Sequence, residues 1–245
     1  MESTPHRYPE IDLLRTLAIL GMVIYHTAYD LGELYRWDFD VLHGGWWFIA
    51  RTTAALFLLV SGMSNTIANV RTKTAGTSAM WQRTIKRSLQ IAAAALLVTL
   101  ATYVMDPDTY IRFGILHCIA VSVFLLPLFQ KFRQWNLLLG IAAIIVGNAI
   151  TGMTAHTSLL LSFGILPPNF SSLDYFPLLP WFGVVLMGNA IADYIYRRKG
   201  FGGMHLPSGL SSVFSAISHW SLVIYLVHQP VILLILMLFF GRSTS

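Results

Sequence analysis

The chain has 245 residues, of which 56% are hydrophobic and only 11% are charged. This composition and a positive mean hydropathy exclude an ordinary soluble domain and predict an integral membrane protein, with lipid around most side chains. The net charge of +5 comes with no interleaving of basic and aromatic residues, so nucleic acid is not an expected partner. The one cysteine, Cys118, cannot form an internal disulfide and is expected to pack as a small hydrophobe.

Several apolar segments come close to the length of about 20 residues that a helix needs to cross a bilayer of ~30 Å. They are residues 13–31, 46–69, 86–105, 111–130, 136–153, 177–196 and 219–240. We therefore expect an all-α fold, a polytopic membrane bundle of about seven transmembrane helices that forms one domain over residues 1–245. No small-residue cleavage site follows the first apolar segment, so this segment is expected to stay in the mature protein.

Lysine and arginine are distributed unevenly between the expected loops. Most lie in the N-terminus, in the loops before the third and fifth segments, and in the loop 197–218. The opposite loops carry only Arg36, Arg112 and Arg242. By the positive-inside rule, the N-terminus is expected in the cytoplasm and the C-terminus outside.

Ionisable residues interrupt the apolar segments at related depths. A rise of 1.5 Å per residue places His26, Arg51 and His117 about 8 to 10 Å below the outer face. Counted from Trp220, His228 lies about 12 Å from the cytoplasmic face and therefore deeper. Such groups are costly against lipid, so they are expected to face the bundle interior and form a site. Each could instead serve only as a hydrogen bond between helices, and Arg51 could extend its charge toward the surface.

His26 and Asp30 share one face of the first helix because they stand at positions i and i+4. There a carboxylate can hold the tautomer of an imidazole and stabilise its cation, which is half of a general-base arrangement. Asp30 could instead simply mark the outer end of the helix in water. Asp38, Asp40 and His43 in the following loop lack the spacing of a metal site, and no metal is expected.

Aromatic pairs stand at the start of two expected spans, with Trp46 and Trp47 opening the second and Tyr175 and Phe176 just before the sixth. They fit an interfacial belt, although aromatic walls around a sugar ring would have the same pattern. The chain has no glycine-rich phosphate loop and no nucleophile elbow, so covalent serine catalysis is not expected.

Four segments in chain order carry a family resemblance. They are Ile11–His26, which includes Arg15, then Phe113–Ala120, Asp174–Gly183 and Ser221–Pro230. The first is similar to the signature of membrane-bound acyltransferases of the acyltransferase-3 type. Together the four resemble the bacterial branch of the heparan-α-glucosaminide N-acetyltransferase catalytic domain, and the resemblance covers nearly the whole chain.

The resemblance implies acetyl transfer across the membrane. Acetyl-CoA would bind from the cytoplasm, and an amino or hydroxyl group of a sugar or glycoconjugate would be acetylated on the outer side. The protein would then lie in the bacterial inner membrane, with the acceptor side facing the periplasm or exterior. Heparan itself is not implied as the acceptor, because this chain lacks the large luminal domain of the lysosomal relatives.

The resemblance also implies roles for particular residues. His26, with Asp30 beside it, would be the general base on the acceptor. The lysosomal relatives carry a histidine in the outer loop after this helix and an asparagine in place of His26, so His43 is the second candidate. Arg15 is expected at the CoA phosphates, about 16 Å below His26, a distance that the extended thiol arm can span. The other expected donor contacts are Arg51, His117 and His228, and the expected acceptor contacts are Trp46, Asp174 and Tyr175.

Direct transfer in a ternary complex is the expected mechanism, with Arg51 or His117 stabilising the oxyanion. A covalent acetyl-histidine is the alternative, and the sequence does not separate the two. Acetyl-CoA is the expected co-substrate, with neither metal nor haem. Membrane lipid is an expected partner, and a homodimer is one option for the oligomeric state.

Three other functions fit part of the pattern. A proton-coupled transporter would also place histidine and aspartate inside a bundle, but it usually has inverted repeats, which are not evident here. A haem-binding electron carrier would need two histidines at one depth, and counting places His228 deeper than the others. A scaffold whose polar residues only fasten helices together is the third.

Overall fold

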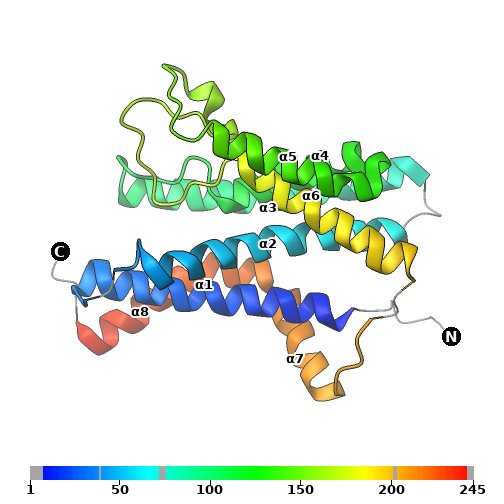
Figure 1. Ribbon diagram of the computed structural model, residues 1–245. Coiled ribbons are helices and arrows are strands. Elements are labelled where there is room, and N and C mark those ends of the chain that lie inside the picture. Colours follow the sequence, from blue (N-terminus) through cyan, green and yellow to red (C-terminus); the bar gives the residue numbers. More distant parts are fainter. Residues whose placement is uncertain (1–7, 39, 72–75, 201–202, 242–245) are drawn as a thin grey trace. The chain divides into compact units, whose positions relative to one another are not determined.

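The computed structural model describes residues 8–38, 40–71, 76–200 and 203–241, and these residues are largely helical (Figure 1). The elements are α1 (Pro9–Tyr35), α2 (Gly44–Arg71), α3 (Gly76–Met105), α4 (Ile115–Phe129), the 3₁₀ segment η2 (Gln130–Trp135), α5 (Asn136–Ala149), the 3₁₀ segment η3 (Ser158–Phe163), α6 (Leu178–Ala192), the π-helical segment η4 (Asp193–Arg198), α7 (Ser208–His219) and α8 (Ser221–Phe240). Six helical stretches among the described residues are long and apolar enough to cross a membrane. The chain is therefore an all-α polytopic membrane protein, as predicted.

One of these six stretches, residues 115–149, contains two helices that run in opposite directions. Helix α4 runs parallel to α6, since Phe113 pairs with Tyr175 before both helices and Phe129 packs on Phe182 further along. Helix α5 runs antiparallel to α6, because the contacts pair the start of α5 with the end of α6 and its end with the start of α6. The chain reverses at η2, where Arg133 has φ 51° and ψ −119°. Seven membrane crossings fit this reversal, and their number stays a prediction.

The described residues divide into two compact units. The first unit comprises residues 1–57 and 202–245, and the second comprises residues 58–201. The boundary falls inside α2. The assignment of one domain to the whole chain stays a prediction.

In the first unit, α1 and α8 run side by side in the same direction (Figure 1). Pro9 suits the first turn of α1 because its φ is already helical, and the acidic Glu10 and Asp12 lie near the positive end of the helix dipole. At the other end, the Tyr35 hydroxyl donates to the carbonyl oxygen of Gly241 at 3.0 Å. The C-terminal ends of α1 and α8 therefore lie at the same end of this unit.

The loop expected over residues 197–218 is not a continuous loop, because α7 occupies Ser208–His219 and packs against α1. Leu210, Val213, Phe214 and Ile217 recur at helical spacing and give α7 an apolar stripe. The helix was missed because it has only 12 residues, too few to span a bilayer. Helix α3 also begins earlier than the predicted span, since its polar first turns extend beyond the apolar part.

In the second unit, glycines bring α6 into backbone contact with its neighbours. A Cβ atom on Gly188 would lie 2.9 Å from the carbonyl carbon of Leu59 in α2, and one on Gly62 would lie 3.0 Å from the backbone nitrogen of Asn189. The same closeness joins α5 and α6 at Gly140. Small residues at helix contacts are typical of membrane bundles, where close approach replaces the hydrophobic effect as the source of attraction.

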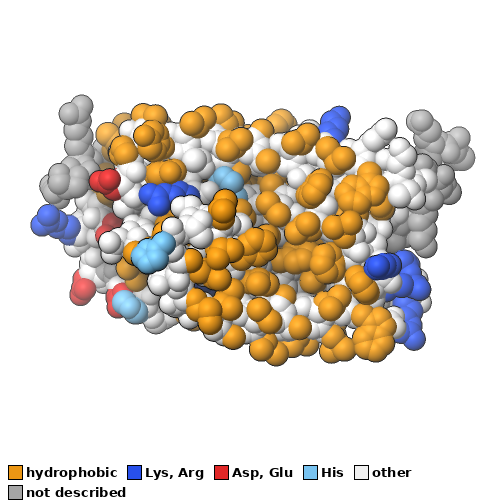
Figure 2. Space-filling model, turned by 90° about the horizontal axis from the view of Figure 1, so that it is seen from above, with side chains coloured by type: hydrophobic (Ala, Val, Ile, Leu, Met, Phe, Trp, Pro, Cys, Tyr) orange, Lys and Arg blue, Asp and Glu red, His pale blue; other side chains and the backbone are white. Residues whose placement is uncertain are grey.

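Figure 2 shows one face of the molecule, where hydrophobic side chains cover the middle and charged side chains gather toward the ends. The charged side chains visible at one end are all lysine or arginine, whereas the opposite end carries both signs. A wide apolar band between charged ends is expected for a surface in contact with lipid. Arg7, Lys73 and Arg242, which contribute to the predicted charge asymmetry, lie outside the described residues.

Candidate functional site

Two histidines meet where α1 packs against α8. We call this contact the seam, and it is formed by His26 and Asp30 of α1 and His228 and Gln229 of α8. The ring centroids of His26 and His228 are 4.9 Å apart. The prediction that His228 lies deeper than His26 is therefore wrong. Counting began at Trp220, but Ser218, two residues earlier, already contacts Arg15 near the start of α1.

Asp30 has a different partner from the one expected. Both of its carboxylate oxygens accept from Nε2 of Gln229, at 2.8 and 2.9 Å, and the residue is only 3% exposed. Within the described part of the chain, no hydrogen bond joins Asp30 to His26. A buried carboxylate needs donors, and the amide of Gln229 supplies them. Gln229 was missed, although a polar residue inside an apolar helix is itself a signal.

His228 has one nitrogen occupied and one bare. Its Nδ1 lies 2.6 Å from the carbonyl oxygen of Tyr225, and a carbonyl can only accept, so Nδ1 carries the proton. The lone pair is then on Nε2, which is buried and has no hydrogen-bond partner among the described residues. The same holds for Oε1 of Gln229. The seam thus contains two buried acceptor atoms without a partner among the described residues.

A cavity of about 340 Å³ opens beside His228, within the size range of small-ligand sites. Its walls are aliphatic side chains of α8 between Ile224 and Leu236, with Val23 and Thr27 of α1 opposite. His228 is the one titratable residue in this lining. The cavity suits a slender, mostly apolar group that lies against His228.

Arg15 lies near the start of α1, on the side of the seam away from the α8 C-terminus. Its Nη1 donates to the Ser218 hydroxyl of α7 and lies 4.0 Å from Oδ1 of Asp12. Its guanidinium side chain remains one-quarter exposed. The positive charge of Arg15, held between α1 and α7, can bind an anionic group at this end of the first unit.

Three further predicted residues lie at the start of α2 or just before it. His43 pairs with Asp40, Nδ1 to Oδ1 at 2.9 Å, and both side chains are exposed. Among the described residues, no hydrogen bond or ring contact joins His43 to His26. The guanidinium of Arg51 lies 5.7 Å from the ring centroid of Trp47, and Trp46 stands in the first turn of α2.

In the second unit, His117 and Asp174 hold the N-terminus of α4. Oδ2 of Asp174 accepts from the backbone nitrogen of Ile115 at 2.9 Å, and Nδ1 of His117 accepts from that of Gly114 at 3.2 Å. Nε2 of His117 lies 3.4 Å from the Thr99 hydroxyl. Both nitrogens of His117 therefore have partners within this corner. Burial raises the pKa of Asp174 to about 6, partly opposed by the hydrogen bond from Ile115.

Tyr175 lies beside the same corner and anchors the outer loop. Its hydroxyl donates to the carbonyl oxygen of Leu161 at 2.6 Å, and its ring packs edge-on against Phe170. Burial raises the pKa of Tyr175 to about 12, so it is a neutral donor at physiological pH. The guanidinium of Arg112 stacks 5.3 Å from the ring centroid of Phe170. An arginine among aromatic rings can bind a sugar or an anion.

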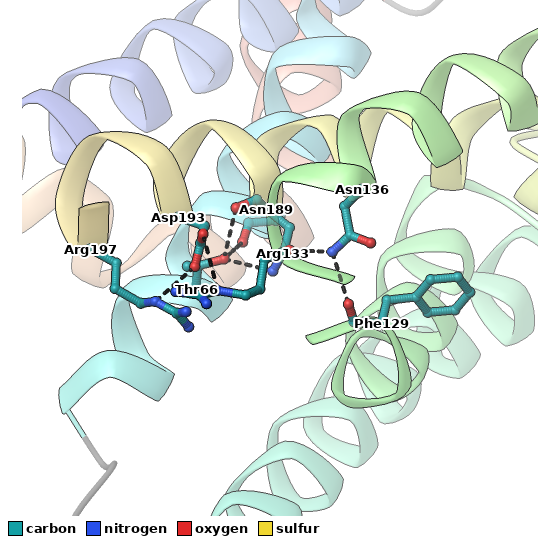
Figure 3. A network of polar contacts seen from close by, with 8 residues as sticks. Thr66, Phe129, Arg133, Asn136, Asn189, Asp193 and Arg197 are labelled. Atoms are coloured by element: carbon teal, nitrogen blue, oxygen red, sulfur yellow. Dashed lines mark hydrogen bonds and ion pairs between the residues drawn. The ribbon is translucent and has the colours of Figure 1, made fainter. Parts of the chain in front are cut away.

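A polar network that the sequence did not reveal ties α2, α5 and α6 together (Figure 3). Nδ2 of Asn189 donates to the Thr66 hydroxyl at 2.7 Å, and Nδ2 of Asn136 donates to Oδ1 of Asn189 at 2.7 Å. At the end of α6, Asp193 pairs with Arg197 at 3.1 Å and lies 3.9 Å from Arg133. The side-chain amides of Asn136 and Asn189 thus connect neighbouring helices through hydrogen bonds within the second unit.

The predicted site residues thus fall into the two units. Those in the first unit are Arg15, His26, Asp30, His43, Trp46, Arg51 and His228, and those in the second are His117, Asp174 and Tyr175. Within the first unit, ring contact and shared neighbours bring His26, Asp30 and His228 together at the seam.

Comparison with known protein families assigns most of the chain to one family. The model of the catalytic domain of heparan-α-glucosaminide N-acetyltransferase matches residues 7–230, which include the seam residues and the corner at Asp174. No curated protein and no solved structure matches the chain. Membership in this family implies acyltransferase activity, with acetyl-CoA as co-substrate. Since the match spans most of its length, the chain belongs to the heparan-α-glucosaminide N-acetyltransferase catalytic-domain family.

Proposed function

We propose that the protein transfers an acetyl group from cytoplasmic acetyl-CoA to an amino or hydroxyl group of a sugar or glycoconjugate outside the membrane. The match to the catalytic-domain family over residues 7–230 carries this proposal. The histidine pair at the α1–α8 seam supports it, because acyl transfer to an amine or alcohol needs a base near the attacking atom.

The donor enters from the end of the first unit where α1 begins. Arg15 contacts the CoA phosphates, and the thiol arm extends along the seam toward His26, about 16 Å away. The aliphatic cavity beside His228 lies at the far end of this path, and it suits the slender, largely apolar end of the arm. Arg51 and His117 are retained as further donor contacts from the sequence.

At the seam, the acceptor nitrogen or oxygen attacks the thioester carbonyl carbon while an imidazole takes its proton. The sequence favours His26 as this base and His43 as second. The exposure of His43 and its pairing with Asp40 favour the seam over the loop. Direct transfer needs no further group, whereas a covalent route would place the acetyl group on an imidazole first.

The acceptor approaches from outside the membrane, and its proposed contacts are Trp46 in the first unit and Asp174 and Tyr175 in the second. The parallel course of α1 and α8 supports termini on opposite sides of the membrane. The cluster of lysine and arginine alone at one end of the face in Figure 2 supports a cytoplasmic location for that end. For a bacterial protein this means the inner membrane, with the acceptor outside.

Isothermal titration of CoA and acetyl-CoA into the detergent-purified protein tests the donor site, beside transfer of radiolabelled acetyl groups to glucosamine. We expect micromolar binding that weakens at least about tenfold in Arg15→Ala and persists in His26→Ala, because one charge–phosphate contact is lost. Arg36→Ala, at the other end of α1, is the matched control. Proton-coupled uptake of a solute without CoA binding would contradict the proposal and favour a transporter.

A further inference from the structure

The bare nitrogen of His228 is a buried polar atom that the fold leaves without a partner. His228 is 9% exposed, and its Nε2 has no hydrogen bond among the described residues. A buried acceptor normally finds a donor, and a lone pair left unsatisfied costs stability. A ligand that lies against His228 could supply the missing donor.

We infer that His228, rather than His26, is the general base of the reaction, and that Nε2 is the atom that takes the acceptor's proton. This inference rests on the acetyl transfer proposed above. The geometry at His228 meets the requirement for a base, because its tautomer is already fixed. Nδ1 donates to the carbonyl oxygen of Tyr225 at 2.6 Å, so the lone pair is held on Nε2 before substrate arrives.

His26 lacks this preparation. Its contacts among the described residues are ring contacts with Tyr25 and His228, and no hydrogen bond selects its tautomer. The carboxylate expected to orient it, Asp30, is instead engaged with Gln229. A base must present its lone pair in one direction, and only His228 of the two has a backbone partner that ensures this.

The surroundings of His228 also give a substrate access and hold the residue in place. His228 forms part of the cavity wall between α1 and α8, so a thioester lying there would contact this residue. The next residue, Gln229, clamps α8 to Asp30 through two hydrogen bonds of 2.8 and 2.9 Å. The clamp fixes the rotation of α8 about its axis and thereby the direction of the imidazole.

The chemical step balances without any further reactant. The acceptor amine or hydroxyl attacks the carbonyl carbon of acetyl-CoA, and its N–H or O–H proton passes to Nε2 of His228. The carbon–sulfur bond then breaks, the acetyl group remains on the acceptor, and the thiolate of CoA takes the proton from Nε2. His228 returns to its starting tautomer with Nδ1 still bonded to Tyr225.

Three substitutions separate the base from the scaffold. His228→Asn keeps an amide N–H near the position of Nδ1 and removes Nε2, so the bond to Tyr225 can persist. His228→Gln places a polar but non-basic group near Nε2, and His228→Ala opens space for added imidazole. His156→Gln, at an exposed histidine of the outer loop, is the control. Each is measured for transfer of radiolabelled acetyl to glucosamine, for CoA binding and for thermal stability.

We expect His228→Asn and His228→Gln to lose at least about 100-fold in kcat while binding CoA like the unsubstituted protein, since a general base contributes about 10²–10⁴-fold. Added imidazole should restore part of the activity of His228→Ala but not that of His26→Ala. The inference is overturned if both polar variants keep turnover within about threefold, or if imidazole rescues only His26→Ala.

Failure of the proposed function has a different signature. An unsubstituted protein that neither binds CoA nor transfers acetyl rejects the acetyltransferase itself. If the protein binds CoA but does not acetylate glucosamine, the tautomer of His228 tests the inference. It is measured by nitrogen-15 NMR of histidine-labelled protein, and the signal missing from His228→Gln is assigned to His228. A proton on Nε2 of His228 overturns the inference, and a proton on Nδ1 with a signal that responds to acetyl-CoA supports it.

Discussion

Two clusters of buried polar side chains, one in each unit, are bonded in different ways. In the second unit, Thr66, Asn136 and Asn189 bond to one another and leave one acceptor, Oδ1 of Asn136, without a partner. At the α1–α8 seam of the first unit, His228 and Gln229 each keep an unpartnered atom, and a cavity adjoins His228. Amides bonded to one another rigidify a fold, whereas a histidine that forms part of a cavity wall can contact a substrate. Substitutions in the second unit should therefore reduce stability, and those in the seam should reduce activity.

The largest expected effect is on the packing of the second unit. Gly188→Ala would press a Cβ atom against the backbone of Leu59, so α2 and α6 must separate. We expect a loss of about 3 kcal/mol or more in unfolding free energy, at the upper end of overpacking, measured by thermal or denaturant unfolding in detergent. Gly209→Ala, where a Cβ meets nothing within 4 Å, is the control. Equal stability of the two variants would contradict the close approach.

Breaking the network of Figure 3 should have the next largest effect. Asn189→Ala leaves the Nδ2 atom of Asn136 and the Thr66 hydroxyl each without one partner. We expect destabilisation of about 2 kcal/mol, because buried polar groups lose their bonds, with activity per folded molecule unchanged. Asn148→Ala, at an exposed asparagine bonded within its own helix, is the control. A loss of turnover at full stability would mean that this network also takes part in catalysis.

The hydrogen bonds between Asp30 of α1 and Gln229 of α8 test the expected role of the seam in activity. Asp30→Asn, Gln229→Leu and the double variant form a cycle that isolates the pair. Each single variant should lose about tenfold in kcat, and the double variant should lose little more than either. Gln229→Leu should also lower the melting temperature, because it leaves the buried Asp30 carboxylate without these donors. The pH dependence of kcat should also shift, since His228 is no longer held. Fully additive losses would show that the two residues act separately.

The smallest effect concerns the corner at Asp174. Its pKa is raised by burial from 3.8 to about 6, so the folded state binds a proton more tightly than the unfolded state. Stability from this group is present at low pH and is lost as pH rises through about 4 to 6. Asp174→Asn should remove this decline and melt about 3 °C higher than the unsubstituted protein at pH 7. If the melting temperatures of Asp174→Asn and of the unsubstituted protein differ by the same amount at every pH between 4 and 7, the raised pKa of Asp174 is contradicted.

Membrane helices and their polar positions could be predicted from the sequence because lipid makes any ionisable residue conspicuous. His26 and Asp30 were placed on one helical face by spacing alone, and the structure brings both to the seam. The four segments that carry the family resemblance lie within the matched region. These features can be predicted because each depends on a single helix, and the period of a helix, about 3.6 residues, gives the face on which each side chain lies.

Partnerships between helices could not be predicted in the same way. That Gln229 serves Asp30, or that Asn136 meets Asn189, depends on the register and rotation of two helices, which no pattern within one helix contains. The depth of His228 was misjudged for the same reason, because the starting point of α8 relative to α1 had to be assumed. His117 and Asp174 are conspicuous in sequence, yet their hydrogen bonds cap α4.

The seam is assembled from the two ends of the chain, with Asp30 and Gln229 separated by 199 residues. During synthesis at about 5–20 residues per second, α1 would wait roughly 10 to 40 s in the membrane before α8 is made. Residues 58–201 emerge in this interval and hold contacts of their own. The nascent protein can therefore acquire much of its structure while its buried carboxylate still lacks its donor. Activity should appear only after the last helix has been inserted, which makes that insertion a natural checkpoint for biogenesis.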